Sequence, residues 1–102
     1  MHLYLSVADP PRIEHHPEQL KDVLPLQPVT FTVKATGTEP MSYRWWHKPA
    51  GKEVWSELQG EDSSTLSIPS TQKSNEGSYY CVVSNCANTE TSKSAEHSVG
   101  KK

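Results

Sequence analysis

The sequence predicts an all-β fold, a two-sheet antiparallel β-sandwich with Greek-key connections. Short stretches of alternating apolar residues recur about every ten residues, and Gly, Pro, Asn, Asp or Ser residues separate them. No longer stretch shows the apolar period of an amphipathic helix. The 102 residues suffice for one domain of this class but not for two. Seven to nine short strands in about 100 residues are typical of such a sandwich.

The first strands come from three stretches. Residues 12–17 (RIEHHP) predict a short edge strand that Pro17 ends, and residues 19–24 (QLKDVL) continue it after the break. Residues 29–36 (VTFTVKAT) alternate strictly between apolar and polar side chains, which predicts a strand with one buried face. That face carries Val29, Phe31, Val33 and Ala35.

The middle of the chain predicts two further strands. Residues 37–40 (GTEP) form a turn, and residues 41–48 (MSYRWWHK) form the strand that follows it. A second turn at residues 48–52 (KPAGK) leads into a short strand at residues 53–58 (EVWSEL).

The last third predicts three strands and one crossover. Residues 64–69 (STLSIP) place Leu66 and Ile68 on one face, and residues 70–77 (STQKSNEG) are a polar crossover with one helical turn. Residues 78–85 (SYYCVVSN) alternate again, and residues 90–99 (ETSKSAEHSV) are the final strand. The inward residues of the first of these two strands are Tyr79, Cys81 and Val83.

The two ends of the chain resemble each other. Ser6-Val7 aligns with Ser98-Val99, about one sandwich repeat apart, although a Ser-Val pair also arises by chance. We interpret residues 1–8 as a remnant strand or linker from a preceding similar domain, residues 9–100 as the domain and residues 101–102 as a tail. This division predicts a chain of tandem repeats.

Four residues carry the most specific pattern. Trp45 lies twelve residues after Val33, Tyr79 lies two residues before Cys81, and Gly77 lies two residues before Tyr79. With the stretches ATGTEPMSYRW and STLSIPSTQKSNEGSYYCVVSN, the chain resembles an immunoglobulin domain of the intermediate (I-set) kind over about residues 9–100. The resemblance implies that a Trp packs in the core and that a Tyr before the second Cys hydrogen-bonds across a corner. The implied core residues are Val33, Trp45, Leu66, Tyr79 and Cys81.

Three positions depart from the family pattern. Val33 stands where the family has the first cysteine, so we expect no inter-sheet disulfide and a buried Cys81 thiol. Asn75 replaces the usual acidic residue, and no Arg that could pair with it lies between Trp45 and Asn75. Leu26 stands where a Gly is frequent; it is strained if this backbone needs a positive φ, and otherwise Pro25 and Pro28 set a different turn.

The two cysteines are not expected to bridge each other. Cys81 and Cys86 differ by an odd offset along one strand, so their side chains point to opposite faces. Cys86 is expected near the surface, where it is inert, pairs with a neighbouring domain or responds to redox conditions.

No catalytic or metal-binding set emerges from the sequence. His15 and His16 are adjacent on an edge strand and point in opposite directions, and no third ligand follows at a fixed offset. No Gly-x-Ser-x-Gly motif and no Gly-rich phosphate loop occurs. His47 shares the parity of Trp45, so we expect a structural, partly buried histidine. The chain is predicted to be no enzyme and to need no cofactor.

Composition and charge limit the partners. The net charge is −2 and the Lys and Arg residues are scattered, so we expect no nucleic-acid partner. The longest apolar runs are only a few residues, so we expect no membrane insertion. Two cysteines, no Asn-x-Ser/Thr sequon and an N-terminus unlike a signal peptide favour an intracellular location, with an extracellular module as the alternative.

One sheet face is a candidate for partner contact. If Trp45 and Cys81 point inward, their neighbours on the two paired strands point outward. Trp, Tyr and Arg are enriched at binding hot spots. The alternatives are that these side chains only stabilise the sheet in cross-strand pairs, or that the segment with Trp55 folds over them. The candidate residues are Arg44, Trp46, Tyr80 and Val82.

The final strand is a second candidate. Residues 90–99 are poor in apolar side chains, which predicts an edge or near-edge strand that could accept a partner strand, although Lys93 and Glu96 protect it. Taken together, we expect a non-enzymatic module for protein–protein interaction in a multidomain, tandem-repeat chain, such as an intracellular scaffold or signalling protein. The alternatives are a structural spacer in a filament or cytoskeletal array and an adhesion or receptor ectodomain module. The predicted partners are proteins of unknown identity and neighbouring immunoglobulin-like domains.

Overall fold

A computed structural model describes residues 9–100 of the chain. The prediction about residues 1–8 therefore lies outside the described residues. The elements of the described part follow in this order: β1 (Arg12–His15), β2 (Leu20–Val23), β3 (Val29–Thr32), β4 (Lys34–Thr36), β5 (Ser42–Pro49), β6 (Ser56–Glu57), β7 (Thr65–Ile68), the 3₁₀ turn η1 (Lys73–Asn75), β8 (Gly77–Ser84), β9 (Thr89–Thr91) and β10 (Ala95–Val99).

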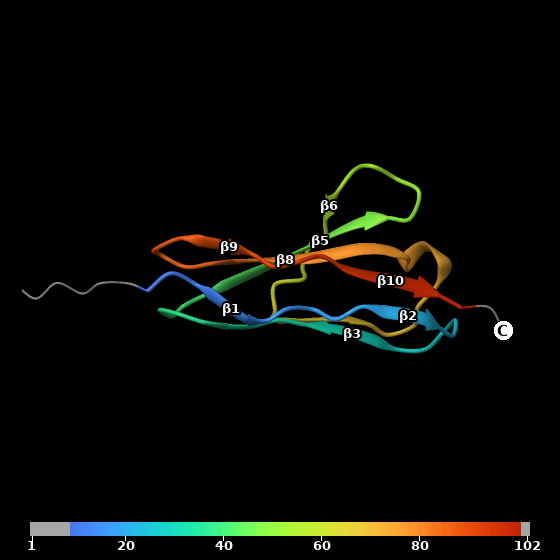
Figure 1. The fold of residues 1–102 in the computed structure, drawn as a ribbon, viewed down its shortest axis with the longest axis horizontal. Helices are drawn as coiled ribbons and strands as arrows, with labels where there is room; N and C mark the ends of the chain where they lie inside the picture. The colour runs from blue at the N-terminus through green and yellow to red at the C-terminus, as the bar shows by residue number, and fades with distance from the viewer. Residues whose placement is uncertain (1–8, 101–102) are drawn as a thin grey trace, which may run out of the picture.

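The strands form two facing layers (Figure 1). In one layer β1 pairs with β4 and β3 pairs with β7, both antiparallel. Only Val33 separates β3 from β4, and its N–H donates to the Ser64 carbonyl (2.9 Å), so the two halves continue one strand. The other layer has the order β2-β10-β8-β5-β6, with β9 beside β8. This arrangement is the predicted two-sheet sandwich.

The N-terminal strand changes layers at a proline. β1 belongs to the layer of β4, whereas β2 runs parallel to β10 in the opposite layer. Pro17 lies between them and is buried. A proline has no N–H for a ladder, so the break predicted at Pro17 is confirmed, and it lets the chain cross the edge of the sandwich.

Two predicted strands are shorter than expected. Of residues 53–58, only Ser56 and Glu57 pair with β5. Residues 90–99 split into β9 and β10, with β10 next to the edge strand β2. At the split, the Ser92 N–H donates to the Cys81 carbonyl (2.8 Å) and the Ser92 hydroxyl accepts from the Cys81 N–H (2.9 Å). The Ser92 hydroxyl thus takes the place of a backbone carbonyl as the acceptor for the Cys81 N–H, and the regular ladder ends there.

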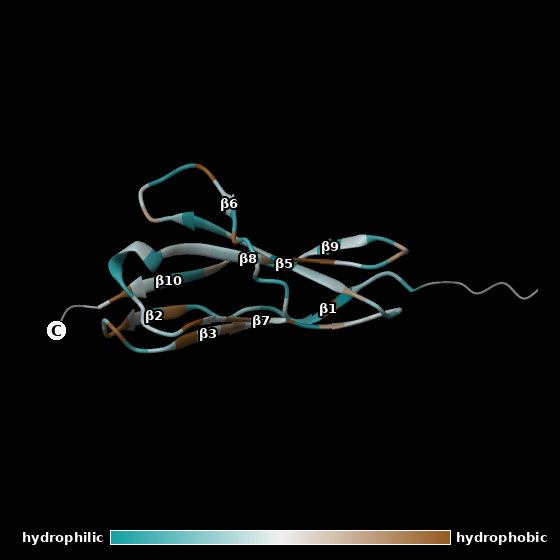
Figure 2. Ribbon diagram, turned by 180° about the vertical axis from the view of Figure 1, so that it is seen from behind, coloured by the Kyte–Doolittle hydropathy of each residue, from teal (hydrophilic) through white to brown (hydrophobic). Residues whose placement is uncertain are grey.

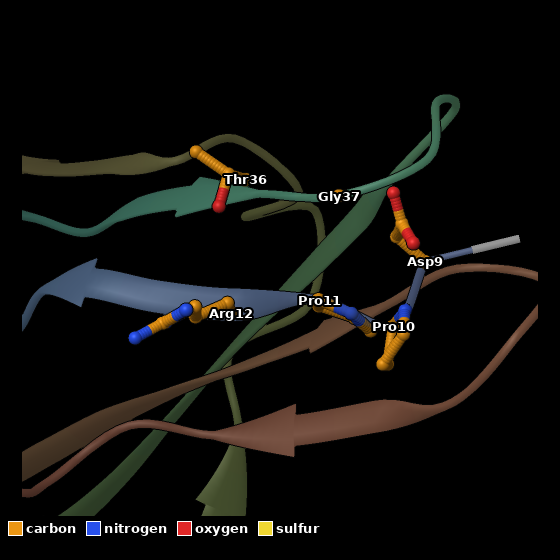
Figure 3. A pocket seen from close by; sticks show the side chains of 6 residues that line it. All are labelled: Asp9, Pro10, Pro11, Arg12, Thr36 and Gly37. Atoms are coloured by element: carbon orange, nitrogen blue, oxygen red, sulfur yellow. The ribbon is translucent and has the colours of Figure 1, made fainter.

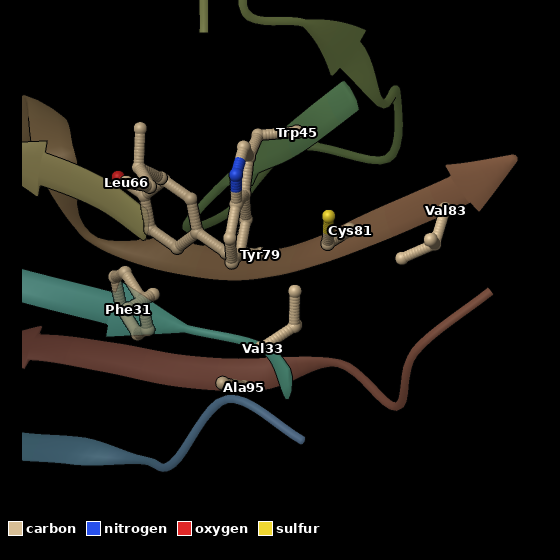
Figure 4. Packing of buried hydrophobic residues seen from close by; sticks show 8 residues of the cluster. All are labelled: Phe31, Val33, Trp45, Leu66, Tyr79, Cys81, Val83 and Ala95. Atoms are coloured by element: carbon tan, nitrogen blue, oxygen red, sulfur yellow. The ribbon is translucent and has the colours of Figure 1, made fainter. Parts of the chain in front are cut away.

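The core lies between the layers. Hydrophobic residues colour β2 and β3 in Figure 2, and Figure 4 shows the buried side chains pointing into the space between the two sheets. Each side chain of this cluster is at most 2% exposed. The cluster consists of Phe31, Val33, Trp45, Leu66, Tyr79, Cys81, Val83 and Ala95.

The turn before β3 contains Leu26, for which the sequence analysis left two backbone conformations open. Leu26 has φ of 70°, so the first alternative for this turn is confirmed. Its N–H donates to the Thr71 carbonyl (2.7 Å), and the Thr71 N–H donates to the Gln27 carbonyl (3.0 Å). The Leu26 side chain is 66% exposed. Hydrogen bonding to the crossover therefore holds a leucine in a conformation that favours glycine.

Within residues 9–100, no helix has the length and apolar character that crossing a membrane would require.

Candidate functional site

The centre of the sandwich is the place where the family disulfide would stand. Trp45 pairs with Cys81 across β5 and β8, and both are fully buried. The Trp45 Nε1–H donates to the Ser63 carbonyl (2.7 Å), which satisfies its one polar atom. Figure 4 shows the Val33 side chain on the opposite layer pointing toward Cys81. Val33 and the thiol thus fill the core as small apolar groups.

Both cysteines are free. Cys81 is buried and Cys86 is exposed, so the pair does not bridge. Burial raises the pKa of the Cys81 thiol to about 12. Cys81 is therefore an unreactive core thiol.

Tyr79 forms the corner that the sequence pattern predicts. Its hydroxyl donates to the Asn75 carbonyl (2.5 Å), and its ring stacks between Phe31 (4.8 Å between centroids) and His47 (4.3 Å). Burial raises the pKa of Tyr79 to about 12. Gly77 has φ of 134°, and a Cβ there would overlap the Lys48 carbonyl oxygen. The glycine is therefore needed for the close approach of β8 to the end of β5.

The crossover is tied to β10 by Glu76. The Val99 N–H donates to Glu76 Oε2 (2.6 Å), and this hydrogen bond is the main cause of the lowered pKa of the Glu76 carboxyl. Lys73 Nζ lies 3.6 Å from the other oxygen and acts in the same direction. Nearby, the buried Thr71 hydroxyl and His97 Nε2 are 2.7 Å apart. These polar groups form hydrogen bonds or an ion pair with one another, so we assign them a structural role.

The histidines also have structural partners. His47 is partly buried, and its Nε2 lies 2.9 Å from the Glu76 carbonyl oxygen. His15 lies 3.5 Å from the Glu18 carboxylate, and His16 Nδ1 accepts from the Lys93 N–H (3.0 Å). Among the residues that the structure describes, no group of three His, Cys, Asp or Glu side chains could hold a metal ion.

The outward face of β5 and β8 brings the four candidate contact residues together. Arg44 pairs with Val82, and Trp46 pairs with Tyr80. The Trp46 and Tyr80 rings are stacked, with centroids 6.3 Å apart and 14° between their planes. We call Arg44, Trp46, Tyr80 and Val82 the outer face.

Trp55 lies against Tyr80 on the outer face, so the segment with Trp55 covers part of that face, as one of the alternatives in the sequence analysis stated. The Trp55 ring meets the Tyr80 ring at 61°, with centroids 4.7 Å apart, and Lys48 Nζ lies 5.7 Å from the centre of the Trp55 ring. At the other end, Arg44 Nε lies 3.8 Å from Glu57 Oε2. Three partly exposed rings therefore lie between two cationic side chains on one sheet face.

A groove that the sequence analysis missed opens between β7 and the opposite layer. Its volume is about 280 Å³, and apolar walls from Leu58, Leu66 and Ile68 meet the Tyr79 ring in it. The chain connects β6 to β7 through residues 58–64 without a strand. The sequence signal was the polar stretch QGEDSS, which has no strand pattern and leaves this side of the sandwich open.

A second hollow lies at the end of the domain where the described residues begin (Figure 3). A Cβ on Gly37, which has φ of 146°, would lie 2.9 Å from the Pro10 carbonyl oxygen. The hollow is lined by Asp9, Pro10, Pro11, Arg12, Thr36 and Gly37. The Asn85 side-chain amide donates to the Asp9 carbonyl (2.6 Å) and the Thr38 carbonyl (3.1 Å). These contacts hold the N-terminal segment onto the sandwich.

A family model described as immunoglobulin domain matches residues 10–85. The chain belongs to the immunoglobulin domain family. Hemicentin-1 of Mus musculus is 36% identical to this chain over an alignment of 85 residues, and the match covers 80% of this chain and 2% of hemicentin-1. The match thus concerns one small part of a much longer protein, and the predicted immunoglobulin resemblance is confirmed at the level of the superfamily.

Solved structures give the same fold. A Dscam structure concerned with isoform specificity superposes with a TM-score of 0.76 at 21% identity, covering 91% of this chain and 25% of the Dscam chain. An I-band fragment of titin superposes with a TM-score of 0.71 at 26% identity, covering 88% of this chain and 32% of the fragment. Family membership makes the domain a non-enzymatic module, as the sequence predicted. The I-set subtype stays a prediction.

Proposed function

We propose that this immunoglobulin domain is a recognition module of a multidomain chain and binds a protein partner through the outer face. Residues 9–100 form the binding domain in this proposal, and residues 1–8 belong to the connection with a preceding similar domain. Hemicentin-1, of which this chain matches 2%, supports a setting in which the domain is one unit of a much longer protein.

The stacked Trp46–Tyr80 pair is the observation that carries the proposal. Both rings are partly exposed on one sheet face, and the partly exposed Trp55 ring lies against Tyr80. Trp and Tyr present large, rigid apolar surfaces that cost little conformational entropy on binding. Arg44 is 68% exposed beside them, and its ion pair with Glu57 at 3.8 Å is weak at the surface. A partner carboxylate can therefore compete for this guanidinium.

The proposal is tested by capture of partners on the immobilised domain. Trp46→Ala is compared with Leu24→Ala, because Leu24 is a 51% exposed apolar residue away from the outer face. Proteins captured from the source cells are quantified for both variants and for the unchanged domain. We expect Trp46→Ala to lower capture of a specific partner about tenfold or more, whereas Leu24→Ala leaves it unchanged. Equal capture by all three forms would contradict recognition through the outer face.

A structural spacer is the second candidate function. Leu24 and Leu26 are exposed, and the Gly100 N–H donates to the Val23 carbonyl (2.8 Å) beside them. Exposed leucines at the pole where the described chain ends suit contact with a neighbouring immunoglobulin domain. The likeness to an I-band fragment of titin supports this candidate. Loss of capture with Leu24→Ala, and not with Trp46→Ala, would favour it.

A further inference from the structure

β7 has one free edge. It pairs with β3, and no other strand of residues 9–100 pairs with it. The Val33 N–H donates to the Ser64 carbonyl, and the ladder pairs Phe31 with Leu66. Alternation along an antiparallel ladder then directs the backbone groups of Leu66 toward β3 and those of Thr65 and Ser67 away from it. The Thr65 N–H donates a hydrogen bond to the Ser63 hydroxyl (3.2 Å). The N–H and C=O of Ser67 remain directed to the open side.

The edge of β7 is also chemically unprotected. Proteins commonly guard edge strands with charged side chains. In the part of the chain that the structure describes, the edge strands β1, β2, β6 and β9 each contain a charged residue: Arg12, Lys21, Glu57 and Glu90, for example. The strand β3 (VTFT) contains none, but His15 and Glu18 line the hollow beside it. β7 has the sequence TLSI and carries no charge. The predicted edge candidate, residues 90–99, is thus better protected than β7.

The groove lies directly beside this edge. Leu66, Ser67 and Ile68 of β7 form one wall, and Leu58 lies on the connecting segment. A strand added to β7 would point every second side chain between the two layers, as Leu66 does. The groove would receive apolar side chains of small or medium size at those positions.

The negative charge beside the groove indicates which side chains an added strand would carry. Glu61 lines the groove and Asp62 follows it on the same segment. Neither carboxylate is in an ion pair with another described residue, whereas Glu57 of β6 is paired with Arg44. A cationic side chain on the solvent side of the added strand would complement this segment.

We propose that β7 adds an extended partner segment along its free edge, with apolar residues at alternate positions and lysine or arginine between them. The Ser67 N–H and C=O hydrogen-bond to the partner backbone, the apolar residues enter the groove, and Glu61 attracts the cationic residues. This surface lies on a different side of the domain from the outer face. The two proposals can therefore fail independently.

The test uses a capped six-residue peptide of alternating lysine and valine, titrated into the isotope-labelled 102-residue chain and followed by NMR. We expect saturable shifts at the amides of Thr65, Ser67 and the groove residues, and slower hydrogen exchange at the Ser67 amide. Absence of saturable binding up to about 5 mM peptide, or shifts confined to other edges, would overturn the proposal.

Ser67→Pro and Thr30→Pro are the matched variants. Ser67 faces Thr30 across the β3–β7 ladder at a position without hydrogen bonds, so each proline removes an N–H that points away from the other strand. Ser67→Pro should lower the affinity for the peptide about tenfold or more, because the substitution removes one hydrogen bond and the proline ring obstructs the added strand. Thr30→Pro should leave the affinity unchanged. Equal affinity of both variants, or loss with Thr30→Pro alone, would overturn the assignment to β7.

A charge reversal tests the edge without changing the backbone. Glu61→Lys should lower the affinity for the lysine–valine peptide about fivefold, with a smaller effect at high salt. The same substitution should raise the affinity for a glutamate–valine peptide of the same length. Glu53→Lys is the matched control, because Glu53 is an exposed carboxylate away from the groove. Equal effects of Glu53→Lys and Glu61→Lys would show only a change in net charge and would contradict the cationic partner strand.

Discussion

The inner and outer faces of the β5–β8 pair carry the same residue types in two different physical settings. Trp45 is fully buried and its indole N–H is bonded within the domain, whereas its neighbour Trp46 lies partly exposed against Tyr80. Cys81 is sealed in the core beside Tyr79, and Tyr80 and Val82 face outward. Adjacent tryptophans in a strand therefore have separable roles: one stabilises the fold, and the other is available for contacts beyond the domain.

The largest effect is expected on the inner face. Trp45→Ala should lower the free energy of unfolding by about 3–5 kcal/mol, because it removes a fully buried ring and leaves the Ser63 carbonyl without its donor. That loss is a large fraction of the free energy of unfolding of a typical domain, which is about 5–15 kcal/mol. Urea unfolding followed by circular dichroism measures it. A loss below about 1 kcal/mol would mean that Trp45 is not central to the core.

The second effect concerns the missing disulfide, and here we expect the free energy of unfolding to rise. Val33→Cys should allow a bridge to Cys81, because both residues belong to the buried cluster and Val33 stands where the family has the first cysteine. Closing this loop would raise the free energy of unfolding by up to about 4 kcal/mol on the chain-entropy model. Thiol counting on the unfolded, oxidised variant should find one free thiol, that of Cys86, and the unchanged chain should have two free thiols.

Val33→Ala is the control, because it also removes side-chain volume without offering a second sulfur. It should destabilise the domain under both oxidising and reducing conditions. If Val33→Cys retains three free thiols under oxidising conditions, the space between the two layers does not permit the bridge.

Much of the fold follows from local patterns. The alternation around Phe31 and that around Cys81 each give the buried face of a strand, because a strand's side chains point alternately to its two sides. Pro17 marks a break because it removes a ladder donor. The polar crossover contains the predicted helical turn, Lys73–Asn75. These features depend on neighbours in sequence, which a single chain displays directly.

Other features depend on residues that are distant in the sequence. The 3₁₀ crossover holds Leu26 at its positive φ through Thr71, so the sequence alone left two turn conformations open. The position of Trp55 against Tyr80 was one of three alternatives for the outer face, because the segment before Ser56 has no ladder that fixes it. The groove beside β7 arises from an absent strand. Periodicity shows strands that form, but it does not show which side of a formed strand lacks a neighbour.

The smallest effect on stability is expected on the outer face. Trp46→Ala removes one cross-strand stacking contact, which contributes about 1 kcal/mol or less when the rings are partly exposed to water. Tyr80 keeps its contact with Trp55 in this variant. Urea unfolding of Trp46→Ala, Tyr80→Ala and the double variant should therefore give a coupling energy of about 0.5–1 kcal/mol. A loss above about 2 kcal/mol for Trp46→Ala alone would place this ring among the contacts that hold the fold. The difference between the two faces would then be one of degree, and a partner would no longer be needed to explain why a tryptophan stands at this position.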